Sequence, residues 1–66
     1  MYKLGIDVGG TNTDAVLIDE NLHVLADIKC PTSGDIYDGI LAALRTVLAV
    51  SGVDKSQIRQ AMLGTT

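Results

Sequence analysis

Hydrophobic and polar positions alternate over the first residues of the chain and predict a β-strand over residues 2–7. Tyr2, Leu4 and Ile6 fall on one side of this alternation, which has the period of two residues typical of a strand with one buried face. Residues 15–18 are instead continuously apolar, as expected of a strand buried on both faces. We therefore predict two strands before the first polar turn.

A third alternating segment covers residues 23–29 and predicts another strand. Its inward-facing positions are Val24, Ala26 and Ile28. The polar outer positions suit a strand near the edge of a sheet. Residues 19–21 before it have the composition of a turn, in which Asn21 is the candidate for a left-handed backbone. Short turns between consecutive strands predict an antiparallel meander.

The apolar period then changes to three or four residues and predicts an amphipathic helix over residues 35–51. Asp35 can cap its first amides, and Gly52 stands where a glycine commonly ends a helix. A last strand is predicted over residues 58–63. Because a helix precedes it, this strand can run parallel to the first through a right-handed crossover. The predicted fold is α/β, of order βββαβ, with a mixed sheet and one crossover helix.

Composition narrows the function classes. The chain has 66 residues, is 47% hydrophobic and carries a net charge of −3. This length leaves no room for a second domain, and the apolar content is too high for a disordered segment. Five Lys and Arg against eight Asp and Glu provide no basic stripe, so we expect no nucleic-acid partner. With two tyrosines as the only aromatic residues, the core must consist of Leu, Ile, Val and Ala.

Cysteine usage and hydropathy bear on the compartment. The single cysteine, Cys30, cannot form an internal disulfide, which favours a reducing environment. No apolar run approaches the roughly 20 residues of a membrane helix, and the N-terminus lacks the layout of a signal peptide. We expect a cytoplasmic protein without membrane contact. A chain that buries only about 60% of its unfolded surface, with no disulfide or metal to stabilise it, also suggests a piece of a larger protein.

The most informative chemistry lies in residues 7–14. Asp7, at the end of a predicted strand, is followed by a Gly-Gly-Thr turn. Two adjacent glycines remove Cβ atoms where an anion would approach the main chain, and the hydroxyls of Thr11 and Thr13 can donate hydrogen bonds to phosphate oxygens. Asp7 supplies a hard oxygen ligand for the Mg²⁺ that accompanies a nucleotide. A tight hairpin with a solvated aspartate is the plainer alternative.

The run L-G-I-D-V-G-G-T-N-T-D at residues 4–14 resembles the first phosphate loop of the actin, sugar kinase and Hsp70 superfamily of ATPases. More narrowly, the chain resembles the amino-terminal region of the hydantoinase A and 5-oxoprolinase family. Three further segments match that family in order: Lys29-Cys30-Pro31-Thr32, Asp38-Gly39-Ile40 and Gly64-Thr65-Thr66. The likeness covers nearly the whole chain. It departs from the family pattern at Asn12, where many members carry a bulkier residue, and this leaves the substrate subgroup open.

The resemblance implies a ribonuclease H-like half-fold. Residues 1–66 would be a single partial ATPase-type domain, the amino-terminal fragment of a larger enzyme. In that enzyme ATP would phosphorylate the amide oxygen of a cyclic amide such as a hydantoin or 5-oxoproline, so that water can open the ring. The remaining domains of the parent enzyme would recognise the adenosine, and the fragment alone is expected to be inactive.

The resemblance also implies roles for individual residues. Asp7 would organise Mg²⁺, and Asp14 would brace the turn or contact the reacting water, which makes both candidate catalytic residues. The phosphates of ATP would be wrapped by Gly9, Gly10, Thr11, Asn12 and Thr13. Thr65 and Thr66 would stand at the carboxyl end of a strand parallel to the first, at the sheet edge where such folds bind ligands.

Two alternative functions stay open. Sugar kinases share the D-x-G-G-T run but need an aspartate base for the sugar hydroxyl, and none is visible outside the glycine loop. The other alternative is a non-catalytic, self-associating module. One helix covers only one face of a four-stranded sheet, which would leave Val16, Ile18 or their neighbours in water on the other face. We therefore expect a homo-oligomer, most simply a dimer.

Overall fold

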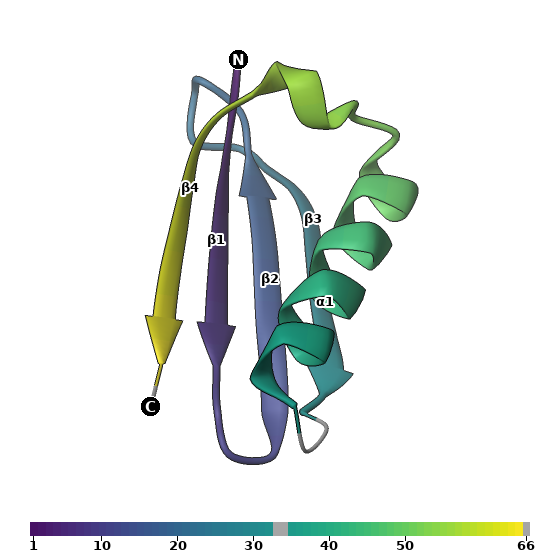
Figure 1. The fold of residues 1–66 in the computed structure, drawn as a ribbon. Helices are drawn as coiled ribbons and strands as arrows, with labels where there is room; N and C mark the ends of the chain where they lie inside the picture. The colour runs from purple at the N-terminus through teal and green to yellow at the C-terminus, as the bar shows by residue number, and fades with distance from the viewer. Residues whose placement is uncertain (33–34, 66) are drawn as a thin grey trace.

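The computed structural model describes residues 1–32 and 35–65, which form a four-stranded sheet and one long helix (Figure 1). In chain order the elements are β1 (Tyr2–Val8), β2 (Asn12–Ile18), β3 (Val24–Pro31), α1 (Ile36–Ser51), the 3₁₀ helix η1 (Lys55–Gln57) and β4 (Ile58–Thr65). The strands are arranged as β3-β2-β1-β4. The predicted βββαβ order and mixed sheet are confirmed.

β1 lies inside the sheet, antiparallel to β2 and parallel to β4. β3 pairs antiparallel with β2. The helix between β3 and β4 carries the chain back across the sheet, which is what a parallel pairing of β1 with β4 requires. As a result, the carboxyl ends of β1 and β4, the β1–β2 loop and the start of α1 gather at one end of the molecule (Figure 1).

The core lies between α1 and one face of the sheet. The helix packs mainly on β3 and β2 and less extensively on β1. The buried apolar residues are Leu4, Ile6, Val8, Ala15, Leu17, Ala26, Ala43 and Val47. The core is thus aliphatic, as the composition predicts, but it also includes the fully buried Thr13. A buried hydroxyl needs a hydrogen-bond partner. The Thr13 hydroxyl bonds to that of Thr32, which in turn donates to Gly9 in the loop between β1 and β2.

Both ends of α1 carry the caps that the sequence predicts. The Asp35 side chain accepts the Tyr37 amide at 2.9 Å, which satisfies one of the first helical donors. Gly52 adopts a left-handed conformation, with φ of 73°, and its amide donates to the Leu48 carbonyl at 2.9 Å. Within the described residues, no helix combines the length and the hydropathy needed to cross a bilayer.

The predicted inward orientation of Val24 is wrong because β3 contains an irregularity. Ala26 lies opposite Leu17, but Val24 lies opposite the next residue of β2, Ile18, so Leu25 is the extra residue of a bulge. The extra residue moves Val24 to the face that α1 does not cover. Its side chain is consequently 61% exposed.

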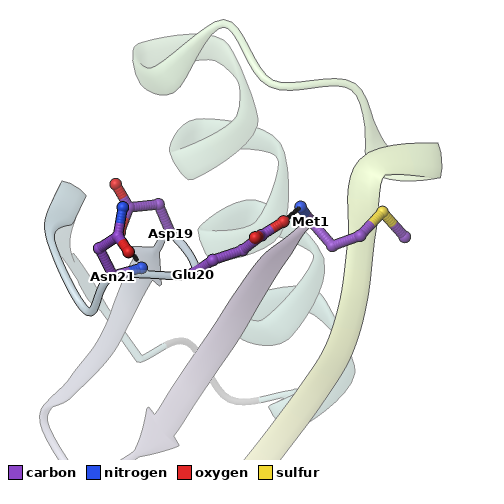
Figure 2. A network of polar contacts seen from close by, with 4 residues as sticks. All are labelled: Met1, Asp19, Glu20 and Asn21. Atoms are coloured by element: carbon purple, nitrogen blue, oxygen red, sulfur yellow. Dashed lines mark hydrogen bonds and ion pairs between the residues drawn. The ribbon is translucent and has the colours of Figure 1, made fainter.

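The turn between β2 and β3 also differs from expectation. Leu22, and not Asn21, has the left-handed backbone, with φ of 65°. The Asp19 carboxylate accepts the Asn21 amide at 2.8 Å (Figure 2). It also accepts the His23 amide at 2.9 Å, and the Leu22 amide donates to the Asp19 carbonyl. Foremost among several causes, the hydrogen bond from the His23 amide lowers the pKa of Asp19. This network of bonds to Asp19 fixes the turn, so Leu22 is left-handed despite its branched side chain.

At the same end of the molecule, the amino group of Met1 pairs with the Glu20 carboxylate (Figure 2). This hydrogen bond is the main cause that lowers the pKa of Glu20. The contact joins the start of β1 to the turn after β2, at the opposite end of the strands from the glycine loop.

The face of the sheet opposite α1 is not covered by any described helix. Gly5, Val16, Ile18 and Met62 line a shallow apolar hollow on this face. Val16 and Ile18 are half-buried, and Met62 is 63% exposed. The sequence predicts that one helix leaves this face open, and the structure places Val16 and Ile18 on it.

Candidate functional site

The loop between β1 and β2 comprises only residues 9–11, because both strands extend beyond their predicted bounds. The Gly9 amide closes the loop by donating to the Asn12 carbonyl at 2.9 Å. Neither Gly9 nor Gly10 has a positive φ angle. A Cβ atom added at Gly10 would meet no atom within 4 Å. Gly10 therefore borders open space, into which a ligand can approach the main chain.

Two backbone donors stand beside this space. Among the described residues, the amides of Gly10 and Thr11 donate to no other group, and both residues are exposed. Successive backbone amides in a tight turn form concavities that bind anions. The loop thus has the donors and the room that a phosphate group needs.

Asp7 and Asp14 face each other across β1 and β2, on the sheet face opposite α1. Asp14 is 3.8 Å from the Lys29 ammonium, and because water reaches both groups this ion pair is weak. On the other side of Asp7 lies Gly64 of β4, where an added Cβ would come within 3.5 Å of the Asp7 carboxylate. The glycine at position 64 therefore leaves room beside this carboxylate.

These aspartates also line an open hollow of about 400 Å³, which Gly64 and Met62 border from β4. Among residues 1–32 and 35–65, no group of three or more His, Cys, Asp or Glu side chains is arranged to hold a metal by itself. Mg²⁺ is commonly held by one or two carboxylates together with phosphate oxygens and water. The pair formed by Asp7 and Asp14 beside the glycine loop fits that mode of binding.

Thr13 lies apart from the other predicted site residues. Its side chain is fully buried on the face that α1 covers, and its hydroxyl oxygen is 3.0 Å from that of Thr32. On α1, a Cβ added at Gly39 would come within 3.4 Å of the same hydroxyl. The Thr13 hydroxyl is therefore engaged inside the protein, on the opposite face of the sheet from the two aspartates.

Sequence reasoning did not assign a role to Thr32. Its hydroxyl donates to the Gly9 carbonyl at 2.9 Å, and its amide donates to the Thr11 carbonyl at 2.8 Å. The only sequence signal was its position directly after Pro31 in a motif shared with the family that the chain resembles. Nothing local indicates which loop a threonine at the end of a strand will contact.

The structure brings Asp7, Asp14 and residues 9–12 together at one end of the sheet. Thr65 joins them through its backbone, which pairs with Val8 at the carboxyl end of β4. Thr66 and the side chain of Thr65 lie outside the described part of the structure. The Thr13 side chain, in contrast, is buried on the face that α1 covers.

Comparison with known proteins gives a family match. A family model described as the hydantoinase/oxoprolinase N-terminal region matches residues 3–66. No protein of curated function matches the sequence.

Solved structures similar to this chain belong to larger proteins. Component A of the (R)-2-hydroxyglutaryl-CoA dehydratase of Acidaminococcus fermentans matches with a TM-score of 0.88 and 20% identity, over 100% of this chain and 25% of that one. The activator of the 2-hydroxyisocaproyl-CoA dehydratase of Clostridium difficile, with bound ADPNP, matches with a TM-score of 0.85 and 22% identity. The match covers 98% of this chain and 24% of the activator. Both share the fold, and this chain spans about a quarter of their length.

A sugar kinase is also similar. The ROK family glucokinase of Streptomyces griseus, in complex with glucose and AMPPNP, matches with a TM-score of 0.78 and 28% identity. The match covers 98% of this chain and 20% of the kinase. The βββαβ unit therefore occurs at high similarity in two structures that hold adenine nucleotide analogues.

Proposed function

The chain belongs to the hydantoinase/oxoprolinase N-terminal region family, and we propose that it is the phosphate-binding segment of an ATP-dependent cyclic amide hydrolase. One observation carries the proposal. Among the described residues, the amides of Gly10 and Thr11 donate to no other group, and Gly10 borders open space in the loop at the carboxyl end of β1, the inner strand that carries Asp7. This is the edge at which open α/β sheets bind ligands. The nucleotide analogues in two similar structures support the proposal.

In the proposed reaction, ATP transfers its terminal phosphoryl group to the amide oxygen of a hydantoin or 5-oxoproline ring. Water then adds to the activated carbon and the ring C–N bond breaks, which leaves an acyl phosphate and a free amine. A second water hydrolyses the acyl phosphate to the open-chain carboxylate and inorganic phosphate. This chain binds and orients the phosphates through the amides of residues 10 and 11, with Asn12 beside them. Asp7 would hold Mg²⁺, which when bound offsets the negative charge of the phosphates. Asp14, opposite Asp7, would orient water or brace the turn.

The rest of the reaction requires the remaining domains of the parent enzyme. The chain spans about a quarter of the first similar structures, and we assign residues 1–66 to one partial ATPase-type domain. Adenosine and the cyclic amide are recognised outside it in this proposal. The isolated chain is therefore expected to bind phosphates weakly and to hydrolyse no ATP.

The test uses the intact parent enzyme and measures ATP hydrolysis that depends on added hydantoin or 5-oxoproline. Gly10→Val fills the open space of the loop, and Asp7→Ala removes the carboxylate that would hold Mg²⁺. Each change is expected to lower kcat/KM by about 100-fold or more, the usual effect of losing one transition-state contact. The control is Thr46→Val, because the Thr46 hydroxyl bonds only within the exposed face of α1. Unchanged turnover in both site variants would reject the proposal.

A sugar kinase is the second candidate function. It is favoured by the 28% identity with a glucokinase that holds glucose and AMPPNP. The same assay separates the two functions when glucose and other hexoses replace the cyclic amide. ATP consumption that requires a hexose, with formation of a sugar phosphate, would replace the hydrolase proposal with the kinase.

For the isolated chain we also propose self-association into a dimer. Among the described strands β4 has a neighbour on one side only, and its Met62 and Leu63 side chains are 63% and 60% exposed. A two-fold axis beside such an edge would pair the β4 strands of two copies antiparallel. Sedimentation over a wide concentration range should show the dimer, and Met62→Lys should weaken it. A monomer at every concentration contradicts self-association.

A further inference from the structure

Thr32 holds both ends of the glycine loop, although it lies more than twenty residues away in the chain. Its hydroxyl donates to the carbonyl of Gly9, and its amide donates to the carbonyl of Thr11. The donor–acceptor distances of 2.9 and 2.8 Å are those of well-formed hydrogen bonds. These contacts give a function to the last residue of the Lys29–Thr32 motif.

The direction of the hydrogen bonds can be assigned. A threonine hydroxyl has one proton, and that of Thr32 is given to the Gly9 carbonyl. The 3.0 Å bond between the two hydroxyls must therefore be donated by Thr13 and accepted by Thr32. A chain of hydrogen bonds thus runs from the buried Thr13, beneath α1, through Thr32 to the loop.

The bond to Gly9 determines where the next amide points. The Gly9 carbonyl and the Gly10 N–H belong to one planar trans peptide unit, in which the C=O and N–H bonds point in opposite directions. Because Thr32 holds the carbonyl from its own side, the Gly10 amide is directed away from Thr32. It finds no acceptor among the described residues.

We propose that Thr32 is a positioning residue, which aims the Gly10 amide at the bound phosphate by holding the Gly9 carbonyl from behind. This inference rests on the proposed function, since it assigns a purpose to an amide of the same loop. Thr32 itself would touch no ligand. Without its hydroxyl the Gly9–Gly10 peptide unit can rotate, and the amide loses its fixed direction.

The single variant Thr32→Val and the double variant Thr13→Val/Thr32→Val separate a positioning role of Thr32 from a purely structural one. A structural role predicts that binding and stability return together in the double variant. Thr32→Val removes the acceptor of Thr13 and leaves a buried hydroxyl without a partner, so the fold itself is weakened. The double variant Thr13→Val/Thr32→Val removes that hydroxyl as well, and folding stability should largely return. The loop, however, remains unheld in the double variant, so phosphate binding should not return.

The experiment measures the 66-residue chain by NMR, with inorganic tripolyphosphate and Mg²⁺ as the probe. For Thr32→Val and for the double variant we expect tripolyphosphate to bind about tenfold more weakly, which is the loss expected from one hydrogen bond. The Gly9 amide should also exchange its hydrogen faster in both variants. Thr32→Ser keeps the hydroxyl and should restore both properties. Thr46→Val, which removes a threonine hydroxyl from α1, should change neither.

The possible outcomes separate this inference from the proposed function. If the double variant recovers binding together with its urea midpoint, Thr32 is only structural and the inference is overturned. If the unmodified chain shows no shift of the Gly10 and Thr11 amides with tripolyphosphate, the proposed function fails for this chain. The hydrogen exchange of the Gly9 amide and the chemical shift of the Gly10 amide are measured without ligand. If neither quantity changes in Thr32→Val, the inference is overturned, whether or not the chain binds tripolyphosphate.

Discussion

Asp19 shows how a single carboxylate organises a turn that its neighbours do not determine. It accepts two backbone amides, and His23 Nδ1 lies 3.3 Å from its second oxygen. Each of these contacts favours the ionised carboxylate. Its pKa is therefore lowered in the folded state, with the His23 amide as the largest cause.

The pH dependence of stability follows from the direction of this pKa shift. Above the unfolded pKa of about 3.9, ionised Asp19 stabilises the folded chain. Below that value the contribution decreases, and it is lost once the pH falls through the lower folded pKa. In Asp19→Asn the free energy of unfolding, measured with urea at a series of pH values, should therefore decrease less steeply as the pH is lowered. Asp27→Asn, an exposed aspartate outside the turn, is the control, and an equal effect of both substitutions would contradict this assignment.

At the scale of elements, the carboxyl end of α1 tests whether glycine at a left-handed position stabilises this fold. Gly52→Ala forces a side chain into a conformation that costs L-residues roughly 1–2 kcal/mol, so we expect a loss of about 1 kcal/mol in the free energy of unfolding. Gly10→Ala is the matched control because its φ is not positive and its Cβ would meet open space. Its effect should stay within about 0.5 kcal/mol. Urea unfolding measures both, and equal losses would show that the cap is unimportant.

Periodicity predicted the elements, and contacts between distant segments determined the rest. The helix and its two caps could be predicted because spacing and capping are properties of consecutive residues. The bulge at Leu25 could not, because Val24, Leu25 and Ala26 are all apolar and their pattern does not show which of them is the extra residue. The candidate phosphate-binding loop at residues 7–12 was proposed from the sequence. The contacts of Thr13 and Thr32 could not be, because both depend on strands that come together only in the folded sheet.

The whole molecule depends on few fully buried side chains. Leu17, in β2, has no exposed surface and lies between the sheet and α1. Leu17→Ala should remove about 2–5 kcal/mol of folding free energy. A chain of this size is expected to have at most about 10 kcal/mol, at roughly 0.05–0.15 kcal/mol per residue.

The matched control is Leu25→Ala, because the Leu25 side chain is 42% exposed at the bulge. It should cost about 1 kcal/mol or less. Circular dichroism with urea titration distinguishes the two variants. Comparable losses at the two positions would mean that the core does not lie where the structure places it.

The pairing of β1 with β4 joins the two ends of the chain, and this has a consequence for the order of folding. Tyr2 pairs with Ile58 and Val8 with Thr65. Closing a loop of roughly 50 residues costs about 3.5 kcal/mol of chain entropy, whereas the β1–β2 hairpin closes over a few residues. On a ribosome the hairpin can therefore form early, while β1 keeps an open edge until β4 has been synthesised. Gly64, the neighbour of Asp7, arrives with β4, so the proposed phosphate site is complete only after β4 has paired with β1.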